Sequence, residues 1–514
     1  MHAVVYNNLS WSEEMAMQRA GGDRWDVVVV GSGNAAMSAG LAALERGTSV
    51  LMIEKAEQDL AGGNTAYTAG AMRFVYAGND DLVPLLVDPE DPRLPRTDFG
   101  AYTAQTFEQD LLGFNDGRPL SREQRILIDE SGAALRWLAT QGVKFEPIYS
   151  RQSFEKDGRF VFWGGLTLAT HDEGFGLARA ELEAFTKAGG EIRYGCPAKG
   201  LIVEDGRVVG VETPQGAFHA KSVVLACGGF ESNAALRTRF IGEGWDKARV
   251  RGTPHNQGDG LEMALALGAK AHGFYGGCHA TPMDLHTPDY GNLELPHGER
   301  KHYRKICYFL GLMLNANGER FVDEGKNFRN YTYAQFGRAI MEQPGHVAWQ
   351  IFDAKVDHLL YSEYRFHDAH FVEADTLDGL LDKLDGIDRA AAKRTIADFN
   401  AAVDEAVPFD PTVKDGRGTK GLALPKSNWA QKIETGPFKA YPVTGGITFT
   451  YGGVEVGDDG GVKREDGSTI PGLYACGEMV GGVFFNGYPG GSGLTSGVVF
   501  GRRAGYGAAT GSRS

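Results

Sequence analysis

A glycine-rich turn in the segment DVVVVGSGNAA, residues 26–36, is the first feature with chemical consequences. Gly31, Gly33 and Ala36 fit the spacing G-x-G-x-x-[G/A] directly after four valines, which are typical of a buried parallel strand. The first glycine permits a tight turn, the second lets a pyrophosphate approach the backbone, and the small third residue lets the next helix pack on the strand. Glu54 ends the next predicted strand, where this fold needs a carboxylate for a ribose hydroxyl. The pattern predicts a dinucleotide site; the alternative is a glycine turn in an unrelated α/β protein.

Several later segments combine glycine with hydrogen-bonding side chains, which is typical of backbone that packs close to a ligand. In the loop 60–74 the alternative is a solvent-exposed loop, and Asp259 either caps a predicted helix or contacts the cofactor. The N-terminus of the last predicted helix, near Gly493, suits a partial negative charge on a ligand. The fingerprint itself supplies Gly31, Gly33, Ala36 and Glu54 as candidate cofactor contacts.

Other groups of reactive side chains are less specific. A basic cluster, HGERKHYRK at 297–305, is interpreted as a group of charged side chains exposed to solvent. If the cluster instead faces the site, it favours an acidic substrate. No C-x-x-C is present, so no iron–sulfur, zinc or c-type haem motif is visible and no metal site is predicted. The scattered cysteines fit a reducing compartment. They are Cys196, Cys227, Cys278, Cys307 and Cys476.

Composition narrows the class of protein. The 514 residues suffice for two or three domains with large cores, and 72 glycines are roughly twice the usual share. A net charge of −14 argues against nucleic acid as a partner, although a site can still be locally basic. No run of eighteen apolar residues exists, so no membrane span is expected. Residues 1–24 lack the apolar core of a signal peptide, and we therefore expect a short extension and a cytoplasmic protein.

The elements that must position these residues can be read from periodicity and capping signals. Ser121 and Gln124 form a capping box for a helix that runs to about Gln141. A β-hairpin should turn at Asp205-Gly206, and amphipathic helices should occupy 375–405. The segment ITFTYGGVEV at 447–456 is interpreted as a pair of strands.

The order of the motifs resembles the flavoprotein subunit family of succinate dehydrogenases and fumarate reductases, from about residue 26 to residue 504. The matching segments are VVVVGSGNAA, GGNTA, LACGGF, GDGLEMA, NANGERFVDE, LYACGEMVGG and GGSGLTSG. Within the family, DEGKNFRNYTYA and NGYPGGSGLTSG are most similar to tricarballylate dehydrogenase. The resemblance implies FAD. The cofactor contacts that it implies are Gly31, Gly33, Asn34, Ala35, Ala36, Glu54, Lys55, Gly62, Gly63, Asn64, Thr65, Gly70, Ala226, Gly228, Asp259, Gly477, Glu478, Gly493 and Leu494. Membrane-bound members carry a histidine bonded to the flavin where this chain has Asn64, so the FAD is expected to be noncovalent.

The resemblance also implies catalytic residues. His279 in CHATP matches a family histidine, and Tyr488 stands where fumarate reductases place a carboxylate-binding arginine. Arg329 is the nearest match to their proton-shuttling arginine, after a one-residue slip. A guanidinium with a pKa above about 12 is an unusual acid, so Tyr331 and Tyr333 are alternatives. A second family histidine falls at Phe449, and a tyrosine before Pro-Gly resembles the ketosteroid dehydrogenases, in which it hydrogen-bonds the substrate carbonyl.

The expected fold is α/β, with a Rossmann-like FAD-binding domain at 1–274 and 450–514 and an inserted α+β capping domain at 275–449. The expected reaction desaturates a C–C bond next to a carboxylate or carbonyl of a small-molecule substrate, as in tricarballylate dehydrogenase. Alternatives are a 3-ketosteroid Δ1-dehydrogenase, a fumarate reductase-like ene reductase and a non-enzymatic electron-transfer subunit. Because only one dinucleotide fingerprint is present, a built-in NAD(P)H site is not expected, and a separate protein or quinone should exchange the electrons.

The first testable expectation concerns how the FAD is held. With Asn64 at the position of the tethering histidine, acid precipitation should release all of the yellow colour into the supernatant. The measurement is the absorbance spectrum of supernatant and washed pellet. Flavin that stays with the pellet would contradict noncovalent binding.

Overall fold

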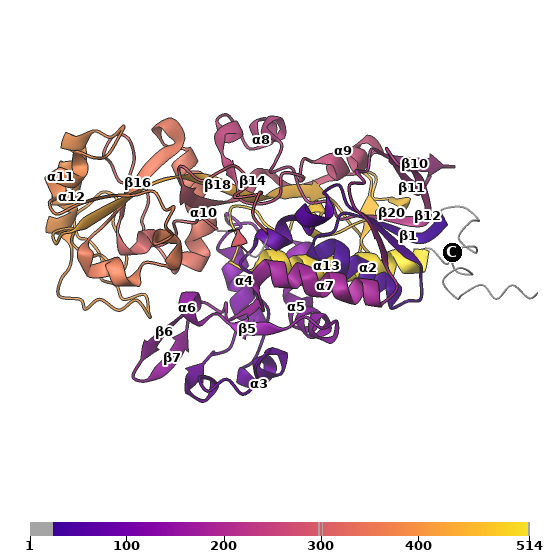
Figure 1. The fold of residues 1–514 in the computed structure, drawn as a ribbon, viewed down its shortest axis with the longest axis horizontal. Coiled ribbons are helices and arrows are strands. Elements are labelled where there is room, and N and C mark those ends of the chain that lie inside the picture. Colours follow the sequence, from indigo (N-terminus) through magenta and orange to yellow (C-terminus); the bar gives the residue numbers. More distant parts are fainter. Residues whose placement is uncertain (1–23, 297–298, 301, 512–514) are drawn as a thin grey trace, which may run out of the picture.

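The computed structural model describes residues 24–296, 299–300 and 302–511. Residues 1–23 of the expected N-terminal extension, and three residues of the basic cluster at 297–305, lie outside this part of the chain. The molecule is elongated and mixed α/β, with α2, α7 and α13 at one end and α11, α12 and β16 at the other (Figure 1).

A mostly parallel sheet forms the first body. Its parallel strands follow the order β20-β12-β1-β2-β9, and antiparallel strands extend it beside β12 and β20. The predicted valine strand is confirmed, because Val27 to Val30 pair with strands on both sides and are almost fully buried. The strands are β1 (Arg24–Val30), β2 (Val50–Ile53), β9 (Glu191–Arg193), β10 (Gly200–Glu204), β11 (Arg207–Thr213), β12 (Gly216–Leu225), β19 (Gly461–Lys463) and β20 (Thr469–Ala475).

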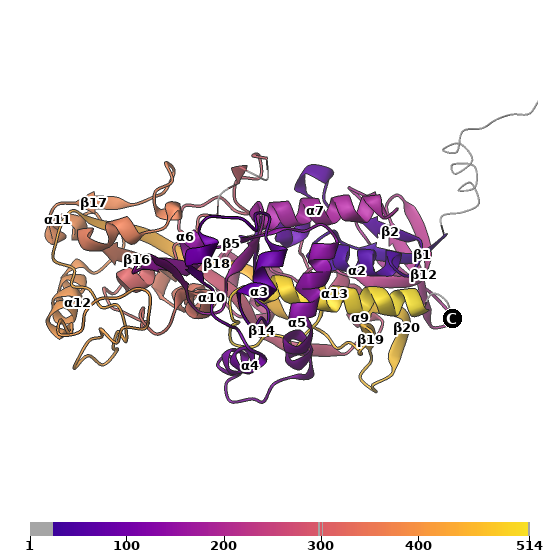
Figure 2. The ribbon, with the colours of Figure 1, turned by 90° about the horizontal axis from the view of Figure 1, so that it is seen from below.

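Two helices from opposite ends of the chain pack directly on one another beside this sheet. They are α2 (Asn34–Leu44) and α13 (Ser492–Gly511), and the view from below shows α13 running alongside α2 (Figure 2). A Cβ at Gly501 would lie 2.6 Å from the carbonyl oxygen of Ala35, and one at Gly505 would lie 2.2 Å from that of Ala39. Glycine therefore brings the two backbones together, which explains part of its abundance.

A second sheet crosses from the first body to the far end of the molecule. Its longest strand, β18 (Phe438–Val454), pairs antiparallel with β14 (Ala271–Asp284) along most of its length. The prediction of two strands at 447–456 is wrong, because β14 pairs with residues 447 to 454 and holds them in one strand. The other strands are β13 (Arg249–Val250), β15 (Leu312–Leu314), β16 (Val347–Phe352) and β17 (Val372–Ala374). The expected domain boundaries fall inside β14 and β18, and the division itself stays a prediction.

The remaining elements cover the two sheets. The capping box of α5, the hairpin at Asp205-Gly206 and the helices at 375–405 are confirmed. No helix in the described part of the chain has the length and apolar character needed to cross a bilayer. The elements are β3 (Ala71–Met72), α3 (Asn79–Leu82), β4 (Thr97–Asp98), α4 (Ala104–Leu112), α5 (Arg122–Thr140), β5 (Phe145–Pro147), α6 (Tyr149–Gln152), β6 (Ser153–Lys156), β7 (Arg159–Phe162), β8 (Leu168–Thr170), α7 (Glu173–Lys187), α8 (Ala234–Phe240), α9 (Asp259–Ala266), α10 (Arg329–Met341), α11 (Leu377–Leu381) and α12 (Arg389–Ala402).

The turn after β1 gives a prediction about Gly31. Its φ is +107°, and a Cβ would lie 2.5 Å from the carbonyl oxygen of Ala226, so Gly31→Ala combines backbone strain with a clash. We expect loss of bound cofactor and a melting temperature lower by several degrees, because strain alone costs roughly 1–2 kcal/mol. The matched control is Gly47→Ala, which has a φ of +73° but meets no atom within 4 Å. Equal cofactor content in the two variants would contradict this assignment.

Candidate functional site

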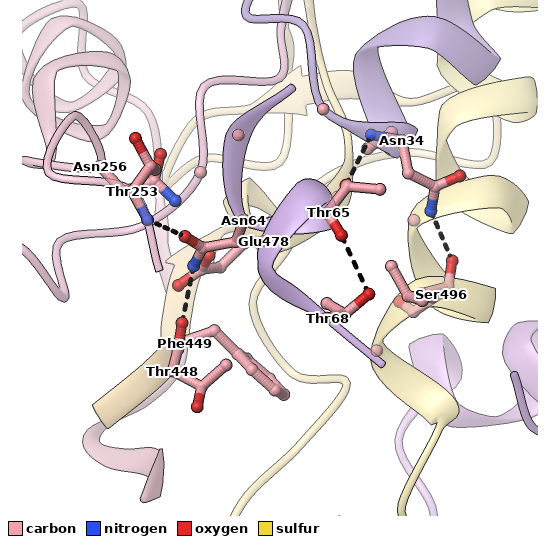
Figure 3. A pocket seen from close by; sticks show the side chains of 18 of the residues that line it. Asn34, Asn64, Thr65, Thr68, Thr253, Asn256, Thr448, Phe449, Glu478 and Ser496 are labelled. Atoms are coloured by element: carbon pink, nitrogen blue, oxygen red, sulfur yellow. Dashed lines mark hydrogen bonds between the residues drawn. The ribbon is translucent and has the colours of Figure 1, made fainter. Parts of the chain in front are cut away.

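A cavity lies where the carboxyl ends of β1, β2, β12 and β20 meet β18. This edge of an open α/β sheet is the usual place for ligand binding. Most of the predicted cofactor contacts meet there, and Figure 3 shows several of them. Those that line the cavity are Gly31, Gly33, Asn34, Ala35, Glu54, Lys55, Gly63, Asn64, Thr65, Ala226, Gly228, Asp259, Gly477, Glu478, Gly493 and Leu494.

Three predicted contacts are not among the residues that line the cavity. Ala36 is fully buried in α2, and the backbone N–H of Gly62 donates to the Ser32 hydroxyl at 3.0 Å. At Gly70, with a φ of +65°, a Cβ would lie 2.4 Å from the hydroxyl oxygen of Thr170. The structure thus places these residues in the support of the site, where small size is required for packing.

One end of the cavity is built for a pyrophosphate and a ribose. The N-terminus of α2 points into it. The Thr65 hydroxyl accepts from the backbone N–H of Asn34 at 2.9 Å, and because Gly33 provides no side-chain cap, the next N–H groups of the first turn are left for an anion. The buried Glu54 carboxylate accepts hydrogen bonds from the Ser32 hydroxyl at 2.5 Å and from the backbone N–H of Ala56 at 2.7 Å. Lys55 pairs with Asp259 at 2.7 Å across this end.

Asn64 joins the two bodies in the middle of the cavity (Figure 3). Its Nδ2 donates to Glu231 Oε1 and to the carbonyl oxygen of Thr448, both at 2.7 Å. Its Oδ1 accepts from the backbone N–H of Thr253 at 2.8 Å. The amide thus uses both donors and its acceptor within the protein, so its role here is to hold loop 62–67 against β18.

Four arginines line the opposite end of the cavity: Arg151, Arg251, Arg304 and Arg329. Arg251 donates to the Thr448 hydroxyl at 3.2 Å, and its buried Nε has no hydrogen-bond partner. Arg329 donates to the Tyr361 hydroxyl at 2.8 Å and to the carbonyl oxygen of Arg151. Among the described residues, neither Arg251 nor Arg329 forms an ion pair with an acid.

Burial and neighbouring positive charge lower the pKa of Arg251 to about 10, so its guanidinium is still protonated at neutral pH. Burial would also lower the pKa of Arg329, but Tyr361 together with the nearby Cys307 and Tyr308 holds that pKa above its ordinary value. Both side chains therefore carry a full positive charge into the cavity.

The other two arginines are paired with acids. Arg151 contacts Glu173 at 2.9 Å, and Arg304 contacts Glu363 at 2.7 Å. Burial would raise the pKa of each glutamate. A hydrogen bond from His302 and the charge of Arg151 instead hold the pKa of Glu173 at about 2, and the charge of Arg304 holds that of Glu363 at about 2. Burial lowers the pKa of His302 to about 4, so the imidazole is neutral at pH 7. Two of the four positive charges are thus uncompensated.

Tyr333, Phe449 and Tyr488 form an aromatic wall of the cavity beside these arginines. The hydroxyls of Tyr333 and Tyr488 lie 2.6 Å apart, and both side chains line the cavity with Phe449. Burial raises the pKa of Tyr488 far above its ordinary value, so this hydroxyl is a neutral donor at physiological pH. Neutral donors aimed at one place can hold a developing negative charge on a substrate oxygen.

Comparison with known proteins identifies the cofactor. Residues 26–494 match the model of a family described as a FAD binding domain. The chain belongs to this family. The match confirms the predicted FAD cofactor, and the N–H groups left at the start of α2 together with Glu54 fit the pyrophosphate and ribose of FAD.

Relatives of this flavoprotein cover most of the chain at low identity. An NADH:fumarate oxidoreductase from Klebsiella pneumoniae (strain 342) is 27% identical, over 99% of this chain and 50% of that protein. The chain thus spans half the length of this relative. A 4-oxocyclohex-2-ene-1-carboxylate 5-dehydrogenase from Sinomonas cyclohexanicum is 26% identical over 93% of each protein. The fold matches the open conformation of a flavocytochrome c3 fumarate reductase with a TM-score of 0.69 and 24% identity, over 99% of this chain and 82% of that one.

The predicted catalytic residues are not all brought together. Arg329 and Tyr488 line the cavity, whereas Tyr331 and His279 are not among the described lining residues. The Tyr331 hydroxyl lies 2.9 Å from both Asp110 Oδ2 and the carbonyl oxygen of Gly164, on the far side of α10. This placement suits a structural role for Tyr331 and leaves Tyr333 as the tyrosine of α10 that faces the cavity.

His279 lies behind the aromatic wall. It is 1% exposed, and its ring stacks on Phe449 with centroids 5.3 Å apart. Burial and the nearby Arg251 charge hold its pKa far below the ordinary value, so the ring is neutral. The register of β14 with β18 pairs His279 with Phe449, which explains the stacking. His279 therefore supports the wall from behind.

Sequence reasoning missed Arg251, Arg151 and Arg304 as individual residues. Arg251 follows the short strand β13, and its backbone N–H donates to Ile447 of β18 at 2.8 Å, which carries its side chain into the cavity. Arg304 belongs to the basic cluster at 297–305, and this cluster was the sequence feature that could have indicated a cavity arginine. For Arg251 and Arg151 no local pattern distinguishes a cavity arginine from a surface one.

The tyrosine pair gives the next prediction. Tyr488→Phe keeps the ring and removes one donor, so flavin reduction by substrate should slow by roughly 10²–10³-fold with FAD content unchanged. Tyr331→Phe is the contrasting variant, because its hydroxyl bonds outside the cavity, and it should lower the melting temperature with a rate within a few-fold of wild type. Anaerobic stopped-flow absorbance measures both rates. A wild-type rate for Tyr488→Phe would remove this residue from the site.

Proposed function

We propose that this protein is a FAD-dependent oxidoreductase that desaturates a C–C bond next to a carboxylate, on a substrate with at least two carboxylates such as tricarballylate. Run in reverse, the same site reduces the alkene. The observation that carries the proposal is the pair of guanidiniums, half-buried Arg251 and buried Arg329, which face the cavity without an acidic partner among the described residues.

Charge balance supports a polycarboxylate. A buried charge without a counter-ion costs several kcal/mol, and a guanidinium cannot shed its proton at neutral pH to avoid this cost. The uncompensated charges of Arg251 and Arg329 match the two carboxylates of a dianion. A third carboxylate would face Arg304, whose buried Nε has no hydrogen-bond partner. An uncharged steroid would leave all of these groups unsatisfied.

The chain's residues then divide into three roles. Bound FAD supplies the hydride acceptor. Arg251 and Arg329 bind substrate carboxylates and fix the position of the bond between them. Tyr488 donates to the oxygen on which negative charge develops. Tyr333 is the proposed proton acceptor, because its hydroxyl lines the cavity 2.6 Å from that of Tyr488, whereas Arg329 is held fully protonated.

A second candidate substrate class is a keto acid. The observation that favours it is the Tyr333–Tyr488 hydroxyl pair, which suits a ketone oxygen, beside arginines that suit a single carboxylate. The Sinomonas relative is named for a substrate of this kind and matches this chain over nearly its full length. The two candidates differ in whether a ketone or a second carboxylate is next to the reacting carbons.

Electrons are proposed to leave through a separate acceptor, either a protein or a quinone, in the cytoplasm. The relative whose name includes NADH is twice as long as the region it shares with this chain. Its nicotinamide chemistry therefore gives no reason to place an NAD(P)H site in this chain, which carries a single dinucleotide fingerprint. An electron-transfer subunit without its own substrate remains the non-enzymatic alternative that the following experiment tests.

Anaerobic mixing with tricarboxylates, dicarboxylates, 4-oxocyclohexane carboxylates and 3-ketosteroids tests the proposal, with bleaching of the flavin absorbance as the measurement. We expect rapid bleaching by a tricarboxylate such as tricarballylate. Bleaching by the keto acid alone would favour the second candidate, bleaching by a steroid alone would contradict both, and no bleaching at all would favour the electron-transfer subunit.

Arg251→Met sharpens the same experiment. Loss of one charged hydrogen-bonding partner should weaken substrate binding roughly 10- to 100-fold, because such bonds contribute about 1.5–3 kcal/mol. The matched control is Arg249→Met, two residues away, whose guanidinium pairs with Asp289 at 2.7 Å and is not among the cavity residues. The measurement is the substrate concentration that half-saturates the rate of bleaching. An equal value for the two variants would contradict a carboxylate site at Arg251.

A further inference from the structure

Arg73 is a fully buried arginine directly after β3. Its Nε donates to the carbonyl oxygen of Gly490 and its Nη1 to that of Gly164, both at 2.8 Å. Its backbone N–H donates to the carbonyl oxygen of Gly491 at 3.1 Å. The residue thus holds the loop 488–491, which directly precedes α13, through both its side chain and its backbone.

The positive charge of Arg73 has its counter-ion within the protein. The guanidinium lies 3.6 Å from Asp110 Oδ2 of α4. The rings of Tyr102 and Tyr331 lie 4.8 and 5.2 Å from its central carbon, and both hydroxyls donate to the same Asp110 oxygen. Arg73 is not among the described lining residues of the cavity, so its charge is used for structure and not offered to a substrate.

The same loop is also fixed to α10, the helix that carries Tyr333. The backbone N–H of Gly490 donates to the carbonyl oxygen of Asn330 at 2.9 Å. The Asn330 side chain donates at 3.2 Å to the carbonyl oxygen of Gly164, which Arg73 also binds. Arg73 and Asn330 therefore contact the same two glycines, one from the end of β3 and the other from α10, and together they set how the loop lies against α10.

The Tyr333–Tyr488 pair depends on this arrangement. Tyr333 comes from α10 and Tyr488 from the loop, two residues before Gly490, and the two hydroxyls lie 2.6 Å apart. A shift of either backbone by about one ångström would break a hydrogen bond of this length. The contacts that hold the loop against α10 therefore also hold the two hydroxyls together.

We propose that Arg73 is a positioning residue for the Tyr333–Tyr488 pair, because it fixes the loop that carries Tyr488 against α10. A guanidinium suits this task, since its planar fork donates to two carbonyl oxygens while it faces a carboxylate. A lysine ammonium keeps the charge but is a single centre, and it cannot reproduce both bonds in the same geometry. The inference rests on the proposed function in one respect, namely that Tyr488 holds the developing negative charge.

The first test measures the order of the loop in the FAD-loaded protein without substrate, by amide hydrogen exchange and mass spectrometry. In Arg73→Lys, a peptide that covers 486–492 should exchange roughly 10- to 100-fold faster than in wild type, the effect of losing one hydrogen bond to a charged group. The matched control is Arg320→Lys, which should leave the exchange of this peptide unchanged. The Arg320 side chain is nearly buried, pairs with Glu324 at 2.5 Å, donates to the carbonyl oxygen of Leu424 at 2.8 Å, and is not among the cavity residues.

The second test is a double-mutant cycle on the rate of flavin reduction, with whichever compound of the panel bleaches the flavin. Arg73→Lys should slow reduction at saturating substrate roughly 10- to 100-fold, with the half-saturating concentration within a few-fold of wild type, because Arg251 and Arg329 keep their places. Arg73→Lys combined with Tyr488→Phe should be no slower than Tyr488→Phe alone, because Arg73 acts through that hydroxyl. A residue that only stabilises the fold would slow both backgrounds by the same factor.

Unchanged exchange of the 486–492 peptide in Arg73→Lys would overturn the proposal, as would the same acceleration in Arg320→Lys or an equal slowing by Arg73→Lys in the two backgrounds. If Arg73→Lys does not fold, Asp110→Ala decides the question. Loss of this counter-ion should accelerate exchange of the same peptide, and no change there would overturn the proposal. A panel in which nothing bleaches the flavin would contradict the proposed function alone, because the exchange measurement involves no substrate and still decides whether Arg73 fixes the loop.

Discussion

The site depends on the antiparallel ladder between β14 and β18. From this ladder β18 continues to its pairing with β16 at the far end of the molecule, and the consecutive residues Thr448, Phe449 and Thr450 of β18 all line the cavity. Arg251 joins the same strand through the backbone of Ile447, and Asn64 ties the cofactor loop to the carbonyl oxygen of Thr448. One continuous strand therefore sets the distance between the FAD end and the arginine end of the cavity.

The positive charges that line this cavity come from several separate elements. Arg251 comes from the loop after β13, Arg329 from the start of α10, and Arg151 from α6. Like charges this close repel, and Glu173 and Glu363 offset only part of that repulsion. The fold thus retains a positive field that is costly when the cavity is empty and favourable when an anion fills it.

The cofactor half of the site could be predicted because its signals are local. A strand, a G-x-G-x-x-A turn and an acid at the end of the next strand lie within thirty residues, and each has a direct backbone reason. The substrate half could not be predicted in the same way. Whether Tyr331 or Tyr333 faces the cavity depends on the rotation of α10, and Arg251 reaches the site only through strand pairing with residues nearly two hundred positions later.

The aromatic wall and the arginines are best understood together. Tyr488 and Phe449 stand where the resemblance places an arginine and a histidine, so the positive charge expected there is absent from the wall itself. Arg251 supplies a charge beside the same wall, and its proximity contributes to keeping His279 neutral. A neutral ring can pack against Phe449 without a counter-ion, which an imidazolium could not do in this buried place. The aromatic wall and the neutral imidazole behind it are therefore compatible with the arginine that approaches from β13.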